Sequence, residues 1–348
     1  MRAYGLMTLL ARVGYRVDFL PDDGFDAGHD SDTLTASGVF VHHVAGTRRQ
    51  GRWLIERADT YDAVIVSRYH LAEALFPMLR RAAPRARLIL DTVDLHHLRE
   101  AREAEQRADV KLRRLALETR RRELAAIDSA DACWVVSPVE QKLIALEAPS
   151  TPVYIVSNLH EAVRDVPGPQ RRHGLLFVGG AAHPPNVDAV RWLSETLFPL
   201  IRERLPNVEM HLVGEGLAAV VPAEQPGVTV HGHVRDLRPL LRNAKVGLAP
   251  LRFGAGVKGK VNLGLAHGLP MVVTECAAEG LHLTHGENVL IANTPDAFVD
   301  AVAQAYNDDL LWDRISRSGR DLTAFHFNAD SALDSIRASL KPLMLKES

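Results

Sequence analysis

A repeated alternation of short apolar runs with amphipathic helical segments is the feature that most constrains the fold. Short runs rich in Val, Ile and Leu are typical of buried strands, and helices between them predict parallel strands joined by crossovers. The alternation stops at the polar segment 161–173, which contains Pro167, Gly168 and Pro169, and then restarts. The sequence therefore predicts an α/β protein with two Rossmann-like domains whose parallel sheets face a cleft.

The predicted domain boundaries follow from this pattern. The first domain covers 1–160, a linker covers 161–173, the second domain covers 174–327, and the final helix in 328–348 is expected to cross back to the first domain. Predicted strands lie at 15–20, 38–43, 63–67, 87–90, 132–136 and 153–156, then at 175–178, 208–213, 228–230, 246–249, 271–274 and 289–291. One long helix is predicted over 97–127.

The first residues do not fit a doubly wound domain. Residues 2–13 are predicted to form a helix, whereas such a domain normally opens with a strand whose loop lines the ligand crevice. Either this fold begins on a helix, or Met1 is an internal start and an opening strand is missing. We expect the second.

Length and composition exclude several classes of protein. A chain of 348 residues fits two domains of roughly 100–200 residues each. The net charge of −2 gives no argument for nucleic acid as a partner. The only cysteines, Cys133 and Cys276, lie in apolar surroundings, which favours a reducing compartment over a disulfide scaffold. No apolar run reaches the roughly 18–20 residues that span a bilayer, so we expect a cytoplasmic protein.

The segment GAGVKGK at 254–260 carries the clearest chemistry. It follows a predicted strand and precedes a predicted helix over 261–267. Gly254 and Gly256 let the backbone approach a phosphate, the first helical turn offers N–H groups without internal partners, and Lys258 and Lys260 add full charges. The alternative is a flexible surface turn with solvated lysines.

Other predicted strand ends in the second half also carry glycines. They are FVGG at 177–180, VGEG at 213–216 and VHGHVRDL at 230–237, and HPPN at 183–186 leads into a helix with Asn186 as its predicted N-cap. Because an open α/β sheet binds ligands beyond the carboxyl ends of its strands, these turns are expected to converge with the lysine loop. An extended, phosphate-bearing ligand is predicted there.

These motifs resemble the donor-binding domain of family 4 glycosyltransferases, which are retaining enzymes of the GT-B fold. The resemblance rests on FVGG, HPPNVDAVRWL, PNVEMHLVGEG, VHGHVRDLRPLL, VGLAPLRFGAGVKGKVNLGLAHGLPMVVT and AAEGL, in that order and spacing. The first half resembles the N-terminal domain of one bacterial subgroup through SRYHLAEALFPMLRR, ILDTVDLHHLREARE and VVSPVEQ. The resemblance implies sugar transfer from a nucleotide-diphosphate donor to a glycan, lipid-linked or small-molecule acceptor.

The resemblance also implies roles for particular positions. Gly179, Gly180 and the 254–260 loop would hold the diphosphate, with Lys258 or Lys260 neutralising it. The backbone of Gly232, His233 and Val234 would meet the base, and Glu279 and Gly280 would lie near the sugar or the β-phosphate. No cofactor and no metal are expected, because basic side chains and helix dipoles stabilise the leaving diphosphate.

The chain departs from the family pattern at a pair of glutamates that usually stand eight positions apart. The matching positions are Ala255 and Leu263, and neither side chain can bind a hydroxyl. Asn262 is adjacent and could replace the glutamate at the ribose, although a polar residue at a helix start is also an ordinary structural feature.

In the first half, ILDTVDLHHL places Asp94 and His96 after a predicted strand. The histidine that related enzymes carry near the donor sugar corresponds to Val93, so His96 is a candidate by proximity and Asp94 is the second. The alternative is that these are polar residues at the surface, with Asp94 capping the next helix. The mixed-charge helix 97–127 is either a solvated face or a peripheral contact with the inner face of the membrane.

Two other classes of function stay open. A sugar-nucleotide epimerase would need an acid and a base carboxylate in the cleft, and no convincing pair is present. A non-catalytic protein that binds a nucleotide sugar or a partner transferase is favoured by the missing glutamates. The 16 histidines offer no metal motif, because the adjacent pairs point apart.

Overall fold

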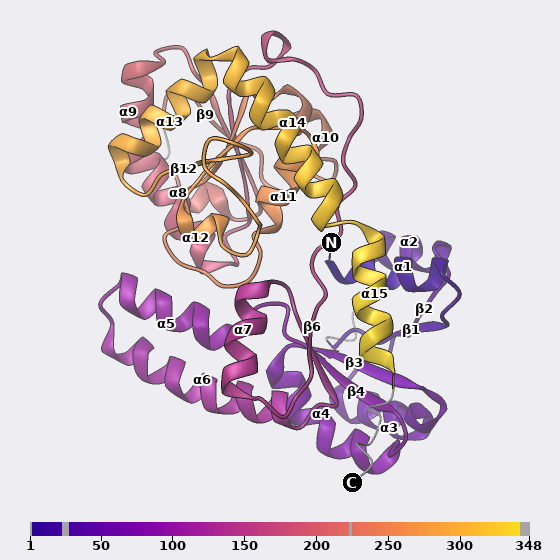
Figure 1. Ribbon diagram of the computed structural model, residues 1–348. Coiled ribbons are helices and arrows are strands. Elements are labelled where there is room, and N and C mark those ends of the chain that lie inside the picture. Colours follow the sequence, from indigo (N-terminus) through magenta and orange to yellow (C-terminus); the bar gives the residue numbers. More distant parts are fainter. Residues whose placement is uncertain (1, 23–27, 223–224, 342–348) are drawn as a thin grey trace. The chain divides into compact units, whose positions relative to one another are not determined.

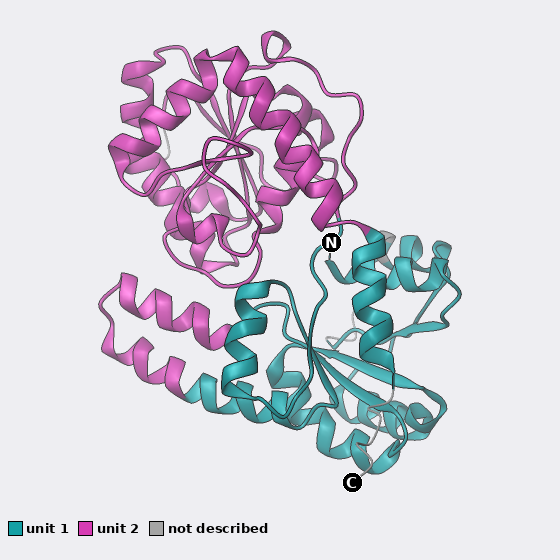
Figure 2. Ribbon diagram, in the orientation of Figure 1, with its two compact units in different colours: residues 1–95, 118–159, 329–348 teal, residues 96–117, 160–328 magenta. Residues whose placement is uncertain are grey.

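A computed structural model describes residues 2–22, 28–222 and 225–341 (Figure 1). The chain divides into two compact units (Figure 2). Unit 1 contains the described residues of Met1–Leu95, Glu118–Leu159 and Ala329–Ser348, and unit 2 contains those of His96–Leu117 and His160–Asn328. Every strand pair in the two units is parallel, as the alternation of strands and helices predicts.

Unit 2 holds a six-stranded sheet in the order β12-β11-β10-β7-β8-β9. Its strands are β7 (Leu175–Val178), β8 (Met210–Val213), β9 (Val228–Val230), β10 (Val246–Ala249), β11 (Met271–Val273) and β12 (Leu290–Ile291). Its helices are α8 (Pro184–Trp192), α9 (Phe198–Arg204), α10 (Arg238–Asn243), α11 (Gly259–Ala266), α12 (Glu275–Ala278), α13 (Pro295–Asn307) and α14 (Asp309–His326). The strand order reverses between β7 and β10, so a ligand crevice is expected beyond their carboxyl ends.

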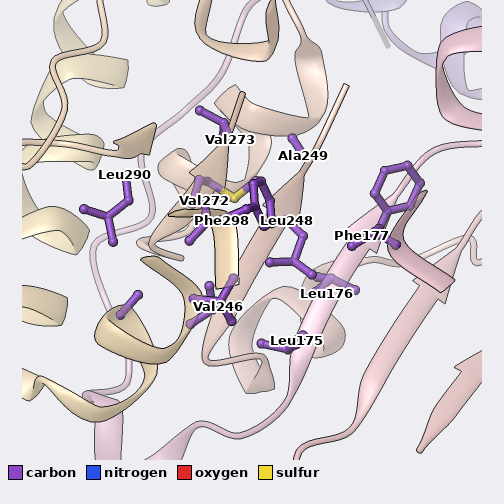
Figure 3. Packing of buried hydrophobic residues seen from close by; sticks show 14 of the residues in the cluster. Leu175, Leu176, Phe177, Val246, Leu248, Ala249, Val272, Val273, Leu290 and Phe298 are labelled. Carbon is purple, nitrogen blue, oxygen red and sulfur yellow. The ribbon is translucent and has the colours of Figure 1, made fainter. Parts of the chain in front are cut away.

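The core of unit 2 explains its apolar strand sequences. Val246 and Leu248 of β10 and Phe177 of β7 are almost inaccessible to solvent. They belong to one buried cluster with Val272 of β11 and Phe298 of α13, and Figure 3 labels all five residues. A strand covered by helices on both faces needs apolar residues throughout, which is why the sequence of β10 predicts a buried strand so clearly. This packing makes a rigid base for the loops that leave β7 and β10.

Unit 1 contains two parallel sheets. One has the order β3-β4-β5-β6, from β3 (Ala63–Ser67), β4 (Arg87–Asp91), β5 (Ala132–Val135) and β6 (Val153–Ile155), and the other pairs β1 (Val17–Phe19) with β2 (Val39–Val41). Its helices are α1 (Arg2–Arg12), α2 (His29–Ala36), α3 (Thr47–Arg57), α4 (Tyr69–Ala82), α7 (Pro138–Glu147) and α15 (Ala329–Leu340). The last helix packs here, because Ile336 joins the cluster around Trp134 and Trp134 Nε1 donates to Ser339 Oγ at 2.9 Å.

The predicted long helix over 97–127 is wrong. The segment forms two helices, α5 (His96–Gln106) and α6 (Val110–Asp128), separated at Ala108, whose φ is +50°. Asp109 Oδ1 then accepts hydrogen bonds from the amides of Lys111 (2.7 Å) and Leu112 (3.1 Å), which caps α6. Residues His96–Leu117 group with unit 2, so the predicted boundary at 160 misses this segment.

The segment 161–173, predicted as the linker, packs against unit 2. Arg172 is buried, and its guanidinium donates to the carbonyls of Pro167, Leu241, Ala244 and His267. Burial, with the nearby charges of Arg242 and Arg320, lowers the pKa of Arg172 to about 10. Four carbonyl acceptors compensate for this desolvation, so the segment is fixed to unit 2.

Candidate anion-binding site in unit 2

Three glycine turns meet at the carboxyl ends of β7, β8 and β9. The amide of Gly179 donates to the carbonyl of Val213 at 2.7 Å, and the amide of Gly214 donates to the carbonyl of Gly232 at 2.9 Å. Gly214 has a φ of +155°, and a Cβ at this position would overlap the backbone of Gly179. Only glycine allows this approach, so the predicted convergence of these turns has a steric basis.

Lys258 and Lys260 lie where β10 leads into α11. Lys258 is buried at the N-cap position, and its Nζ donates to the carbonyl of Gly256 at 2.8 Å. Lys260 is half-buried in the first turn, and its ammonium lies 4.4 Å from the ring centroid of Phe177. The alternative of solvated lysines in a flexible turn does not fit these positions.

The ammonium of Lys260 has neutral surroundings. Within the described part of the chain its only hydrogen-bond partner is Oδ1 of Asn186, and a Cβ on Gly179 would stand 2.7 Å from its Nζ. Burial, with a smaller effect from the charge of Lys258, lowers the pKa of Lys260 to about 7. Two lysines gathered at a helix N-terminus, one of them against neutral groups, form a site suited to an anion.

Asn186 corrects one prediction. It is not the N-cap of α8, because Pro184 and Pro185 start the helix earlier and His183 occupies the cap position. Asn186 is buried in the first turn instead, where Oδ1 accepts from Lys260 and Nδ2 donates to the carbonyl of Gly180 at 2.9 Å. Its side chain therefore links the 179–180 turn to α11.

Asn262 is the unusual polar residue of the site. It is completely buried in the first half of α11, and neither Nδ2 nor Oδ1 has a hydrogen-bond partner among the described residues. A buried polar group without a partner costs about 1–3 kcal/mol, so such a group in a native protein needs an explanation. Hydrogen bonding of the Asn262 amide to a ligand would be such an explanation.

Glu279 and Gly280 lie in the turn that follows α12, and Glu279 is the C-cap of that helix. Arg102 of α5 donates to both carboxylate oxygens of Glu279, at 2.8 and 2.7 Å, and to the carbonyl of Gly254 at 2.7 Å. Burial alone would raise the pKa of Glu279, but the hydrogen bonds and charge of Arg102, with the charge of Lys258, lower it. Sequence reasoning missed Arg102.

The 232–234 segment lies at the end of β9. Gly232 has a φ of +62° and accepts from Gly214, Val234 packs against the unit 2 core, and the His233 side chain is exposed. Just before them, His231 Nε2 lies 3.0 Å from His211 Nδ1. A base-binding role for this backbone stays a prediction.

In unit 1, strained backbone marks the carboxyl ends of β3 and β4. Arg68 and Val93 have φ values of +75° and +65°, and for a β-branched residue such as Val93 this is a costly conformation. Asp91 is buried, paired with Arg2, and accepts from the amide of Val93 at 3.2 Å. Asp94 follows this strained position.

His96 opens α5 and is half-buried, whereas His97 is buried. The predicted roles of Asp94 and His96 near a donor sugar stay predictions. No group of three or more His, Cys, Asp or Glu side chains suited to a metal ion occurs among the described residues.

Comparison with known proteins finds a family match in the second half of the chain. Residues 172–308 match the family model described as Glycosyl transferases group 1. A protein of Klebsiella pneumoniae, named an uncharacterized 44.6 kDa protein in the cps region, is 22% identical over 129 residues. That match covers 34% of this chain and only 33% of the relative.

Solved structures show that the fold is GT-B. HepE of Anabaena, in complex with UDP and glucose, has a TM-score of 0.73 at 14% identity, covering 97% of this chain and 95% of HepE. Sucrose-phosphate synthase from Thermosynechococcus elongatus has a TM-score of 0.68 at 14% identity, covering 96% and 90%. A variant of TarM from S. aureus has a TM-score of 0.65 at 12% identity, covering 84% and 58%.

Proposed function

We propose that this chain is a glycosyltransferase that binds a nucleotide-diphosphate sugar at the carboxyl edge of the unit 2 sheet. The observation that carries the proposal is the ammonium of Lys260, desolvated beside Lys258 at the start of α11 with only a neutral hydrogen-bond partner. The group 1 domain at 172–308 and the GT-B fold support the same function. The neighbour HepE was solved with UDP and glucose, which supports a donor of this class.

In the proposed mechanism, unit 2 stabilises the leaving diphosphate. The first-turn amides of α11 and the two lysines stabilise the negative charge that develops on the diphosphate as the sugar departs, and no metal ion is required for this. The amide of Asn262 hydrogen-bonds the ribose, and the 232–234 backbone contacts the base. Glu279 and Gly280 lie near the sugar. Membership in the retaining family 4, and a role for His96 or Asp94 at the sugar, are parts of this proposal that rest on the resemblance.

The acceptor is proposed to be a glycan, a lipid-linked glycan or a small molecule. No helix in the described ranges is long and apolar enough to cross a bilayer. Contact with the inner face of the membrane remains part of the proposal, because α6 exposes Val110 and Leu117 beside Arg114 and Arg121. Failure to co-sediment with anionic vesicles would remove that part.

A panel of UDP-, GDP- and dTDP-sugars tests the function. One nucleotide class is expected to raise the melting temperature by several degrees, because a ligand at 100 times its Kd stabilises the folded state by about 2.7 kcal/mol. Slow hydrolysis of the same donor is expected without added metal and in the presence of a chelator. If none of these nucleotide sugars raises the melting temperature, the proposal is contradicted. Binding without hydrolysis or transfer favours the non-catalytic alternative.

Donor binding is expected to take up a proton at pH 8. The pKa of Lys260 is lowered from 10.5 to about 7, so the free ammonium is largely deprotonated at this pH, and an incoming diphosphate favours the charged form. Affinity should therefore fall as the pH rises above 7. In the unfolded chain this lysine binds its proton up to about pH 10, so the stability of the free protein should rise with pH between about 7 and 10.

Calorimetry with a UDP-sugar in two buffers of different ionisation enthalpy measures this proton. The diester diphosphate of a nucleotide sugar does not titrate near pH 8, so the uptake reports on the protein. Lys260→Arg is the control, since a guanidinium stays charged and should remove the uptake. Wild-type protein that binds with no proton uptake would contradict the assignment to Lys260.

A further inference from the structure

The short loop 92–95, which joins β4 to α5, is held in a strained conformation. Val93 has a φ of +65°, and this left-handed conformation is costly for a β-branched residue. Glycine would adopt it without that cost, so a connection from strand to helix does not by itself require a strained valine. A conformation of this kind persists only where the surrounding contacts determine it.

Two buried carboxylates provide such contacts, one on each side of Asp94. Asp91 ends β4, and its Oδ1 accepts a hydrogen bond from the amide of Val93 at 3.2 Å. Glu140 lies in the first turn of α7, and its Oε1 accepts from the amide of Leu95 at 3.2 Å. Leu95 is itself completely buried. The backbone is therefore fixed immediately before and immediately after Asp94.

The start of α7 places Glu140 for this contact. Ser137 is the N-cap of α7, and its Oγ accepts from the amide of Glu140 at 3.2 Å. The other carboxylate oxygen, Oε2, accepts from the amide of Val136, which follows β5, at 3.2 Å. One side chain thus joins the end of β5 to a loop 45 positions away in the sequence. Its two amide donors compensate for the burial of its charge.

Asp91 is held by several partners in unit 1. Its carboxylate pairs with Arg2 of α1, and its Oδ2 also accepts from Ser67 Oγ at 3.4 Å. Its carbonyl accepts from the amide of Arg68 at 2.7 Å. Because these contacts restrict rotation of the Asp91 side chain, the amide of Val93 is bound in one place.

We propose that Glu140 and Asp91 are positioning residues, which hold the 92–95 loop so that Asp94, and His96 at the start of α5, keep the arrangement that sugar transfer needs. The inference deepens the proposed function and rests on it, since that function gives Asp94 or His96 a role at the sugar. Glu140 and Asp91 act through backbone amides. Precise placement accounts for two buried carboxylates and a strained valine at so short a loop, because a displacement of about 1 Å can lower a rate about 100-fold.

Hydrolysis of the nucleotide sugar that gives the largest melting shift tests this on the full chain. Glu140→Ala removes both amide contacts and should lower kcat about 10- to 100-fold. The Kd of the corresponding nucleoside diphosphate should stay within about threefold of wild type. A lower kcat at unchanged nucleotide affinity is the result expected when only the reacting groups are displaced. Losses of similar size in kcat and in nucleotide affinity would overturn the inference.

Asp131→Ala is the matched control. Asp131 Oδ2 also accepts from a backbone amide of β4, that of Leu88 at 2.8 Å, and its carboxylate pairs with Arg80. This contact lies toward the other end of the strand. Both substitutions should lower the melting temperature, since each leaves an amide without its acceptor, but Asp131→Ala should keep kcat within about threefold of wild type. An equal fall in kcat in the two variants would overturn the inference, as would an unchanged kcat in Glu140→Ala.

Hydrogen–deuterium exchange of the segment 91–96 separates the two proposals. Exchange should become faster in Glu140→Ala than in wild type, and should not change in Asp131→Ala. Unchanged exchange in Glu140→Ala would mean that Glu140 does not hold the loop, and the inference alone would fail. If wild-type protein hydrolyses none of the nucleotide sugars, the proposed transfer fails and the positioning role fails with it. If Glu140→Ala does not fold, Glu140→Gln, which keeps the shape but only one acceptor oxygen, takes its place.

Discussion

Replacing Lys258 and Lys260 together by methionine should weaken binding of the preferred nucleoside diphosphate at least about 100-fold, while binding of the corresponding nucleoside changes little. Each charged hydrogen bond to a phosphate is worth about 1.5–3 kcal/mol, or roughly 10- to 100-fold in affinity. Methionine keeps an unbranched apolar chain, so packing against Phe177 and Gly179 is retained. Calorimetry with the diphosphate and the nucleoside, on the single and double variants, measures the difference.

Lys245→Met is the matched control for this experiment. Lys245 immediately precedes β10, at the opposite end of that strand, where its ammonium pairs with Asp309 at 3.2 Å and lies 5.2 Å from the ring centroid of Tyr306. Its loss should leave nucleotide binding unchanged. Equal losses for diphosphate and nucleoside in the double variant would mean that the lysines only support the loop, and would contradict a phosphate role.

Asn262→Leu should stabilise the free protein and weaken the donor complex. Removing two buried polar atoms that lack partners recovers about 1–2 kcal/mol, which corresponds to roughly 3–6 °C in melting temperature for a domain of this size. If Asn262 bonds the ribose, affinity should fall about tenfold for the diphosphate and for the nucleoside alike, since both carry ribose. This pattern differs from that of the lysines.

Asn186→Leu is the comparison for this prediction. Asn186 is buried like Asn262, but its amide is bonded to Lys260 and to the carbonyl of Gly180, so its replacement should lower the melting temperature. A lower melting temperature in Asn262→Leu would mean that the amide has a partner in the free protein, and would remove the reason for giving it a ligand.

The sequence predicted those parts of the site that local chemistry determines. Strand β10 could be predicted because it is buried throughout and is therefore apolar throughout. A turn at Gly214 could be predicted because the backbone of Gly179 lies too close for any side chain at position 214. Lys258 and Lys260 follow from the loop, since a strand, a glycine-rich turn and a helix start define where their backbone lies.

Contacts between distant segments could not be predicted in this way. Arg102 is separated from Gly254 by 152 positions, and in a helix of mixed charge nothing distinguishes it from a solvated arginine. The break at Ala108 was missed because Asp109 caps the next helix without any glycine or proline. The packing of segment 161–173 against unit 2 could not be predicted, because Arg172 bonds four backbone carbonyls that only the folded unit brings together.

A crystal structure with the nucleoside diphosphate that gives the largest melting shift is the most direct test of the central claim. The account predicts that the phosphates lie at the carboxyl ends of β7 and β10, within hydrogen-bond distance of Lys260 Nζ and of the first-turn amides of α11. It also predicts that the ribose lies against Asn262. A nucleotide bound elsewhere, with Lys260 still bonded only to Asn186 and no phosphate at the start of α11, would contradict it.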